Sequence, residues 1–139
     1  MSGMGDSHAI SIEQLRKVGG PLVDVRSPGE YAQGHWPGAI NIPLFSDAER
    51  AEVGTTYKRE GRLPAIHLGL AMTGPKLSHL AKELDKLRNQ GDPRIYCWRG
   101  GMRSASVAWL AEQIDLKPTR LDGGYKSYRR WVLSRFDQP

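Results

Sequence analysis

Residues 21–30 read Pro-Leu-Val-Asp-Val-Arg-Ser-Pro-Gly-Glu, a short β-branched apolar run followed at once by a helix start. The run from Leu22 to Val25 predicts a buried strand because it is short and bounded by Gly and Pro. Ser27, followed by proline and by Glu30 three residues on, forms a capping box that predicts the first turn of a helix. A strand that leads directly into a helix is the repeating unit of α/β folds, whose sheets are parallel.

The same alternation continues along the chain and predicts one α/β domain over residues 1–139, with a disordered N-terminus at 1–8. Further strands are expected at residues 39–42, 94–96 and 118–121. Helices are expected from about Asp47, over 76–88, from about Ser104, and over 125–136. Six Gly and Pro residues interrupt the stretch 54–75, which predicts broken helix and loop there.

The composition excludes several classes of protein. The chain has 139 residues and a single cysteine, Cys97, so no internal disulfide and no thiolate-rich zinc site can form. It contains no apolar run long enough to cross a membrane, and its first residues lack the pattern of a secretory signal. We therefore expect a cytoplasmic protein without a membrane partner. The four histidines show no metal-binding spacing, and we expect neither a metal nor a cofactor.

The net charge of +5 is concentrated in the last third of the chain. Residues 1–93 carry 11 basic and 11 acidic side chains, whereas residues 94–139 carry 9 basic and 4 acidic ones. Either this excess forms a solvated cationic face, or it binds an anion, whether a small oxyanion or a nucleic-acid backbone. The predicted last helix shows the same ambiguity, because its basic residues alternate with Tyr125, Tyr128 and Trp131.

The most informative stretch runs from Tyr96 to Ser104, where a predicted strand ends at Cys97 and a turn rich in Gly and Arg leads into a helix. Ligands of parallel sheets bind beyond the carboxyl ends of the strands. Gly100 and Gly101 are expected to take positive φ angles, so that backbone N–H groups curl around one point. With a helix N-terminus and two arginines close by, this setting favours a thiolate that is open to solvent. A lone cysteine is otherwise a small buried side chain, but here we predict a nucleophile.

Three segments resemble the rhodanese family: residues 22–31, 34–43 and 121–125. The resemblance implies a five-stranded parallel sheet flanked by helices on both faces, and a cysteine that carries sulfur or selenium as a persulfide or selenosulfide. By position, Cys97 is that catalytic residue, and the Gly123-Gly124 pair lies near the mouth of the site. The loop that binds the substrate anion then comprises Trp98, Arg99, Gly100, Gly101, Met102, Arg103 and Ser104. The side chain of Trp98 has two interpretations, packing or stacking on a nucleobase.

Residues 47–58 and 99–104 are similar to tRNA 2-selenouridine synthase, a family in which a P-loop domain follows the rhodanese domain. Its members exchange the sulfur of a wobble 2-thiouridine for selenium from selenophosphate, through an S-geranylated intermediate. The resemblance implies a small chalcogen donor anion, selenophosphate or thiosulfate-like, and tRNA and a P-loop domain as partners. This chain contains no Gly-x-x-x-x-Gly-Lys-Ser/Thr motif, so it resembles the amino-terminal domain alone.

Two other functions compete with chalcogen transfer. Cys97 and Arg103 have the Cys-x5-Arg spacing of cysteine phosphatases, but residues 98–103 contain no carboxyl group that could protonate a leaving oxygen. A non-catalytic regulatory domain is the third class, and an unreactive Cys97 would favour it. Asp24 and Arg26 lie at the end of the first predicted strand, and we assign them a structural role near the site, because buried charges are normally paired.

Overall fold

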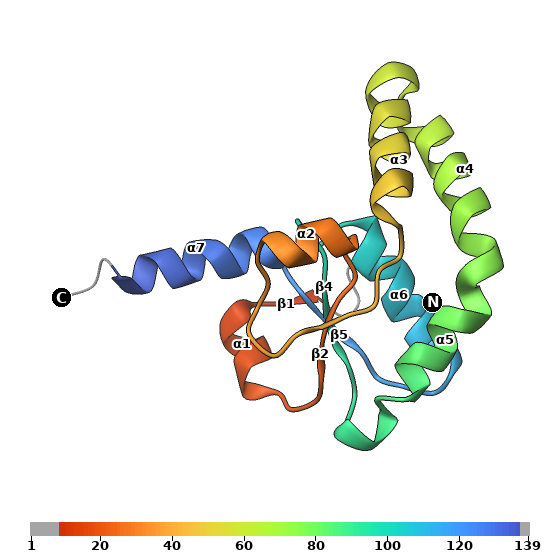
Figure 1. The fold of residues 1–139 in the computed structure, drawn as a ribbon. Coiled ribbons are helices and arrows are strands. Elements are labelled where there is room, and N and C mark those ends of the chain that lie inside the picture. The colour runs from red at the N-terminus through yellow and green to blue at the C-terminus, as the bar shows by residue number, and fades with distance from the viewer. Residues whose placement is uncertain (1–8, 137–139) are drawn as a thin grey trace.

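The computed structural model describes residues 9–136 and shows a five-stranded parallel sheet with helices on both faces (Figure 1). This arrangement confirms the expected α/β fold. The strands are β1 (Ala9–Ile10), β2 (Leu22–Asp24), β3 (Ile40–Asn41), β4 (Arg94–Tyr96) and β5 (Thr119–Leu121), and their order in the sheet is β1-β5-β4-β2-β3. Strand β4 therefore lies at the centre, with β2 and β5 as its neighbours, and all pairs are parallel.

The helices and the two short 3-10 turns connect these strands. They are α1 (Ile12–Lys17), α2 (Pro28–Gln33), α3 (Asp47–Glu60), α4 (Arg62–Thr73), η1 (Gly74–Lys76), α5 (Leu77–Asp85), η2 (Arg88–Gln90), α6 (Met102–Gln113) and α7 (Gly124–Phe136). The capping box expected at Ser27 with Glu30 is present, and a second capping box, at Ser46 with Glu49, begins α3.

Two apolar clusters cover the two faces of the sheet. Because side chains alternate along a strand, Val23 and Ile95 point to one face, where they pack against α5 and α6. Leu22, Tyr96 and Leu121 point to the other face, where they pack against α1 and the aromatic side of α7. Arg120 therefore points to the α6 face, on which the side chain of Cys97 also lies.

The prediction of broken helix and loop over residues 54–75 is wrong about the loop, since the segment is helical except for a break at Gly61. Helix α3 continues to Glu60, and α4 follows after Gly61, whose φ of +99° ends the first helix. The two helices pack side by side as a hairpin that projects from the rest of the domain (Figure 1). Gly54 and Gly69 are accepted inside these helices. Gly69 has a packing reason, because a Cβ there would lie 3.3 Å from the ring of Phe45.

Three local details differ from or add to the expectations. Strand β1 and helix α1 precede the first predicted strand, and the sequence patterns did not indicate them. Helix α6 begins at Met102, two residues before Ser104. The predicted disorder of residues 1–8 lies outside the described part of the chain. Within residues 9–136, no helix combines the length and apolar character needed to cross a membrane.

Candidate active site around Cys97

Cys97 lies immediately after β4, at the carboxyl end of the central strand. The expectation of a solvent-open thiol is wrong, since the residue is 2% exposed. It lines a cavity of about 850 Å³ between the α3–α4 hairpin and α6, and this cavity is its route to a ligand. A buried thiol at the wall of a cavity is shielded from bulk water and still accessible to a substrate that fills the space.

The cavity has mostly apolar walls and several cations. Its apolar lining comes from the hairpin, from the segment after β3, from α5 and from α6, and includes Phe45, Val53, Ile66, Leu70, Leu77 and Trp109. Four arginines also line it: Arg50, Arg62, Arg99 and Arg103. Trp98 and Met102 of the predicted anion loop contribute to the same cavity. The combination suits a ligand with an apolar part and an anionic part.

The turn after Cys97 needs one glycine in a left-handed conformation, not two. Gly100 has a φ of +75°, and a Cβ there would lie 3.0 Å from Gly123 N. Gly101 has a φ of −89°, so the expected positive angle is wrong at that position. Gly101 is instead the residue from which α6 begins, and its carbonyl accepts the first bond of the helix from Ala105 N.

The Gly-Gly segment after β5 brings α7 directly onto the Cys97 loop. Gly123 and Gly124 both have positive φ angles, +77° and +61°. A Cβ at Gly124 would lie only 2.4 Å from the carbonyl oxygen of Cys97. This close approach allows Tyr125 N to donate to Cys97 O at 2.7 Å and Lys126 N to Trp98 O at 3.0 Å.

Ser104, on the first turn of α6, contacts the sulfur of Cys97. The distance from Cys97 Sγ to Ser104 Oγ is 3.3 Å, and Ser104 Oγ also lies 3.2 Å from the carbonyl of Gly101, to which it donates. The hydroxyl has one proton, so it donates either to that carbonyl or to an ionised sulfur. Rotation of a single hydroxyl thus provides a hydrogen bond to whichever form of Cys97 is present.

Arg120 is a functional residue that the sequence reasoning missed. Its side chain is buried; Nε donates to Ser104 Oγ at 3.2 Å, and Nη2 donates to Gly100 O at 2.5 Å and to Gly101 O at 3.2 Å. It thereby places a buried positive charge behind the hydroxyl that contacts the sulfur and fixes the carbonyls of the loop. The available signal was an arginine inside a predicted strand, between Thr119 and Leu121.

Arg103, expected to hold the substrate anion, is occupied by a carboxylate in the structure. Its Nη1 lies 2.7 Å from Glu30 Oε1, and its Nη2 lies 3.4 Å from Glu30 Oε2. Burial alone would raise the pKa of Glu30, but the hydrogen bond and charge of Arg103, together with Ser27, hold it below its usual value. Glu30 is thus a carboxylate at neutral pH, and it orients Arg103.

Arg50, at the N-terminal end of α3, joins this group and was also missed. Its Nε lies 3.7 Å from Glu30 Oε1, and its side chain lines the Cys97 cavity. Burial and the neighbouring charge of Arg103 lower the pKa of Arg50, while Glu30 and Cys97 act in the opposite direction. Arg50, Arg103 and Glu30 together carry a net charge of one positive unit, and this charge lies beside the Cys97 sulfur.

Asp24 and Arg26 bind each other beneath the site. Arg26 Nη2 lies 2.8 Å from Asp24 Oδ2, and it also donates to Gly34 O at 2.6 Å. Burial would lower the pKa of Arg26, but the carboxylate of Asp24 raises it above its ordinary value. The guanidinium stacks 4.2 Å from the ring centre of Tyr125, so the pair anchors the loop after β2 to the start of α7.

Comparisons with known proteins agree with this architecture. The family model for the rhodanese-like domain matches residues 9–130. The chain is 43% identical over 126 residues to tRNA 2-selenouridine synthase of Bordetella petrii and 40% identical over 121 residues to that of Sulfurovum sp.. These matches cover 88% and 85% of this chain but 33% of each relative, so the chain spans about a third of their length.

A solved structure supports the same assignment. The chain is 41% identical to the N-terminal domain of a protein from Clostridium difficile 630, with a TM-score of 0.85, covering 90% of this chain and 98% of that one. The sheet order, the cysteine at the end of the central strand and the family match lead to one conclusion: this chain belongs to the rhodanese-like domain family.

Proposed function

We propose that this chain transfers sulfur or selenium through a covalent adduct on Cys97, as the rhodanese domain of a tRNA 2-selenouridine synthase. The observation that carries the proposal is the position of the sulfur, which lies at the wall of a cavity with Ser104 in contact and Arg120 behind it. A nucleophilic thiolate needs nearby donors and positive charge, and Ser104, Arg120 and Arg50 supply them.

The uptake step follows from this geometry. The Cys97 thiolate attacks the outer sulfur of a thiosulfate-like donor, the S–S bond of the donor breaks, and sulfite leaves with the electron pair. Selenophosphate carries selenium at the selenide level, so it loads Cys97 only when Cys97 is a mixed disulfide with a small-molecule thiol. The selenium attacks the Cys97 sulfur, the thiol leaves with the electron pair, and water takes up the phosphoryl group as phosphate, which gives a selenosulfide on Cys97. Arg99 and Arg62 both line the cavity, and neither forms an ion pair with a carboxylate among residues 9–136. Because Arg99 belongs to the loop that follows Cys97, it is the arginine that we assign to the leaving oxyanion.

The apolar walls of the cavity suit the acceptor that the resemblance implies. An S-geranylated thiouridine carries a branched hydrocarbon chain on the sulfur to be replaced, and this chain would lie against the hairpin and α6. Selenium on Cys97 would attack C2 of the base and displace geranylthiolate. A small-molecule thiol would then attack the Cys97 sulfur of the remaining S–Se bond. The selenouridine would leave with the electron pair, and Cys97 would return to the mixed disulfide that accepts the next selenium.

Intact mass spectrometry tests the uptake step. After exposure to thiosulfate, the protein should gain the mass of one sulfur, and Cys97→Ser should gain none, because Cys97 is the only cysteine. With selenophosphate and a small-molecule disulfide, one selenium should be gained and phosphate should appear in solution. Release of phosphate without an adduct would contradict the selenosulfide. A stable phosphocysteine formed from an aryl phosphate would instead support a phosphatase, and an unmodified Cys97 with every donor would support a regulatory domain.

A matched pair of variants in α4 tests the acceptor cavity. Leu70 lines the cavity and is 63% exposed, whereas Leu63 is 62% exposed on the same helix and does not line it. Leu70→Asp should weaken binding of an S-geranyl thiouridine nucleoside about tenfold or more, because a charge replaces apolar contact. Leu63→Asp should bind as the wild type does. Equal effects of the two substitutions would contradict this location for the hydrocarbon chain.

A further inference from the structure

A second, smaller cavity lies where the Cys97 loop meets α7. It has a volume of about 320 Å³ and is lined by Arg99, Asp122, Gly123, Lys126, Ser127 and Arg130. Three of these residues are cations and one is a carboxylate. Arg99 lines this cavity and the larger one, so the two spaces flank the same loop.

The cations of this surface differ from the other arginines near the site. Arg26 and Arg103 are bound to carboxylates, and Arg50 lies close to one. By contrast, no carboxylate within residues 9–136 forms an ion pair with Arg99, Lys126 or Arg130. Their charge is thus available to an anion from solution.

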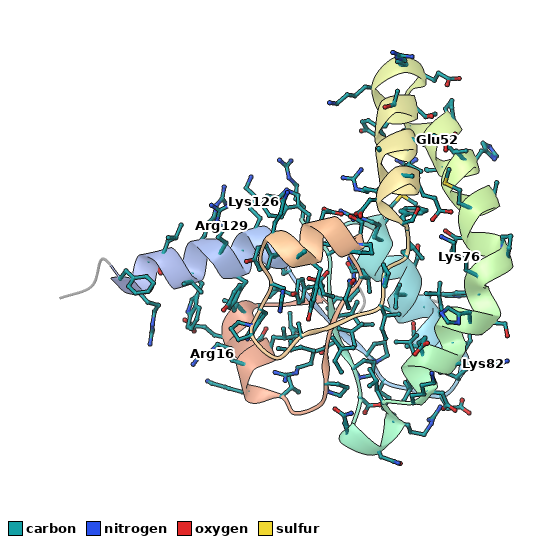
Figure 2. All side chains as sticks on the ribbon, in the orientation of Figure 1. Arg16, Glu52, Lys76, Lys82, Lys126 and Arg129 are labelled. Carbon is teal, nitrogen blue, oxygen red and sulfur yellow. The ribbon has the colours of Figure 1, made fainter. Side chains whose placement is uncertain are left out.

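The position of this surface relative to the reacting sulfur is fixed. Tyr125 N and Lys126 N donate to the carbonyls of Cys97 and Trp98, so the first turn of α7 moves with the loop. The basic surface then continues along the helix. Figure 2 shows Lys126 and Arg129 on the side of α7 that points away from α1. The aromatic side of the same helix packs on the sheet, whereas Arg129 and Arg130 are exposed and Lys126 is half-buried.

We infer that this surface, Arg99 with Lys126, Arg129 and Arg130, binds the phosphodiester backbone of an RNA whose target base occupies the larger cavity. The inference rests on the proposed function for the identity of that base. The distribution of positive charge over this surface favours a phosphodiester backbone over a compact dianion. The cations extend in a row along α7, and Asp122 in the same cavity repels a dianion, whereas a strand with one charge per phosphate can follow the row.

The test is the salt dependence of RNA binding, measured by fluorescence anisotropy with a labelled tRNA anticodon stem-loop. The variant Lys126→Gln/Arg130→Gln removes two cations from the surface. The control Lys17→Gln/Lys82→Gln removes two exposed cations from α1 and α5, and it causes the same change of net charge. Circular dichroism verifies that both variants fold.

The expected result is a smaller slope of log affinity against log salt for the α7 variant. Each lost phosphate contact lowers the slope by about 0.7 to 0.9, which for two contacts corresponds to roughly 25- to 60-fold weaker binding at about 0.1 M salt. The control should keep the wild-type slope and affinity. Equal losses in both variants, an unchanged slope in the α7 variant, or no binding by the wild type at low salt would overturn the inference.

Two further measurements separate this inference from its alternatives. If polyglutamate of matched charge displaces the RNA equally well, the surface recognises acidic peptides generally and the inference fails. Chalcogen uptake at Cys97, followed by intact mass, is measured on the same wild-type sample. Failure of uptake in the wild type, with salt-dependent RNA binding intact, would therefore contradict the proposed function alone.

Discussion

The close approach of α7 to the Cys97 loop leads to a sharp prediction for Gly124→Ala. The new Cβ would lie 2.4 Å from Cys97 O and 2.6 Å from the carbonyl of Trp98, whereas ordinary van der Waals contact begins near 3.4 Å. Helix and loop must therefore separate by about 1 Å. The substitution also places a side chain at a φ of +61°. Conformational strain of about 1–2 kcal/mol and overpacking of about 1–3 kcal/mol add up to roughly 2–5 kcal/mol of lost stability.

Gly38→Ala is the matched control for this prediction. Gly38 also has a positive φ, +88°, but a Cβ there would meet nothing within 4 Å. Gly38→Ala should therefore lower the free energy of unfolding, measured in urea, by the strain contribution of about 1–2 kcal/mol alone. The separation at Gly124 displaces the sulfur, and a shift of about 1 Å in a reacting group can lower a rate about 100-fold.

The assay for displacement is the rate of Cys97 alkylation by iodoacetamide at neutral pH. Gly124→Ala should react far more slowly than the wild type, and Gly38→Ala should react at the wild-type rate. If Gly124→Ala does not fold while Gly38→Ala does, the clash at Gly124 costs more than about 2–5 kcal/mol, and the result still supports a close approach of α7 to the Cys97 loop. Equal stability and equal alkylation rates in the two variants would refute it.

Two further predictions concern the charges around the sulfur. Glu30→Gln should lower the free energy of unfolding by about 1.5–3 kcal/mol at neutral pH, because Arg103 loses its charged partner. The pKa of Glu30 is lowered in the fold, so its stabilisation is present above its ordinary value of 4.5 and is lost as the pH falls through the folded value. The difference between variant and wild type in urea unfolding should therefore shrink in acid, and a pH-independent difference would contradict the pairing. Arg120→Met removes the donor to Gly100 O and should lower stability by about 1–3 kcal/mol and slow Cys97 alkylation several-fold. Arg120→Lys, which keeps the charge, should recover part of the rate, and equal rates in both variants would exclude a role for that charge.

Local patterns predicted most of the fold. The strand at 22–24 and the capped helix after it depend on neighbouring residues alone, so the expected positions agree with the structure. The α3–α4 hairpin was missed because Gly54 and Gly69 are intrinsically poor helix residues. Packing between the two helices overrides that preference, and it depends on residues that are distant in sequence.

The candidate site also has features that the sequence predicted and features that only the structure revealed. The sequence by itself determined which reactive and charged groups the site contains. These are a lone cysteine at a strand end, a glycine turn after it and an excess of basic residues, and residue types and short spacings carry this information. Only the tertiary structure decided how the charges are used. It buried Cys97 in a cavity wall, engaged Arg103 with Glu30 and placed Arg120 behind Ser104. The physical reason is that electrostatic partners are selected by distance in space, and the partners of Arg103 and Arg120 lie on other elements, distant in the chain.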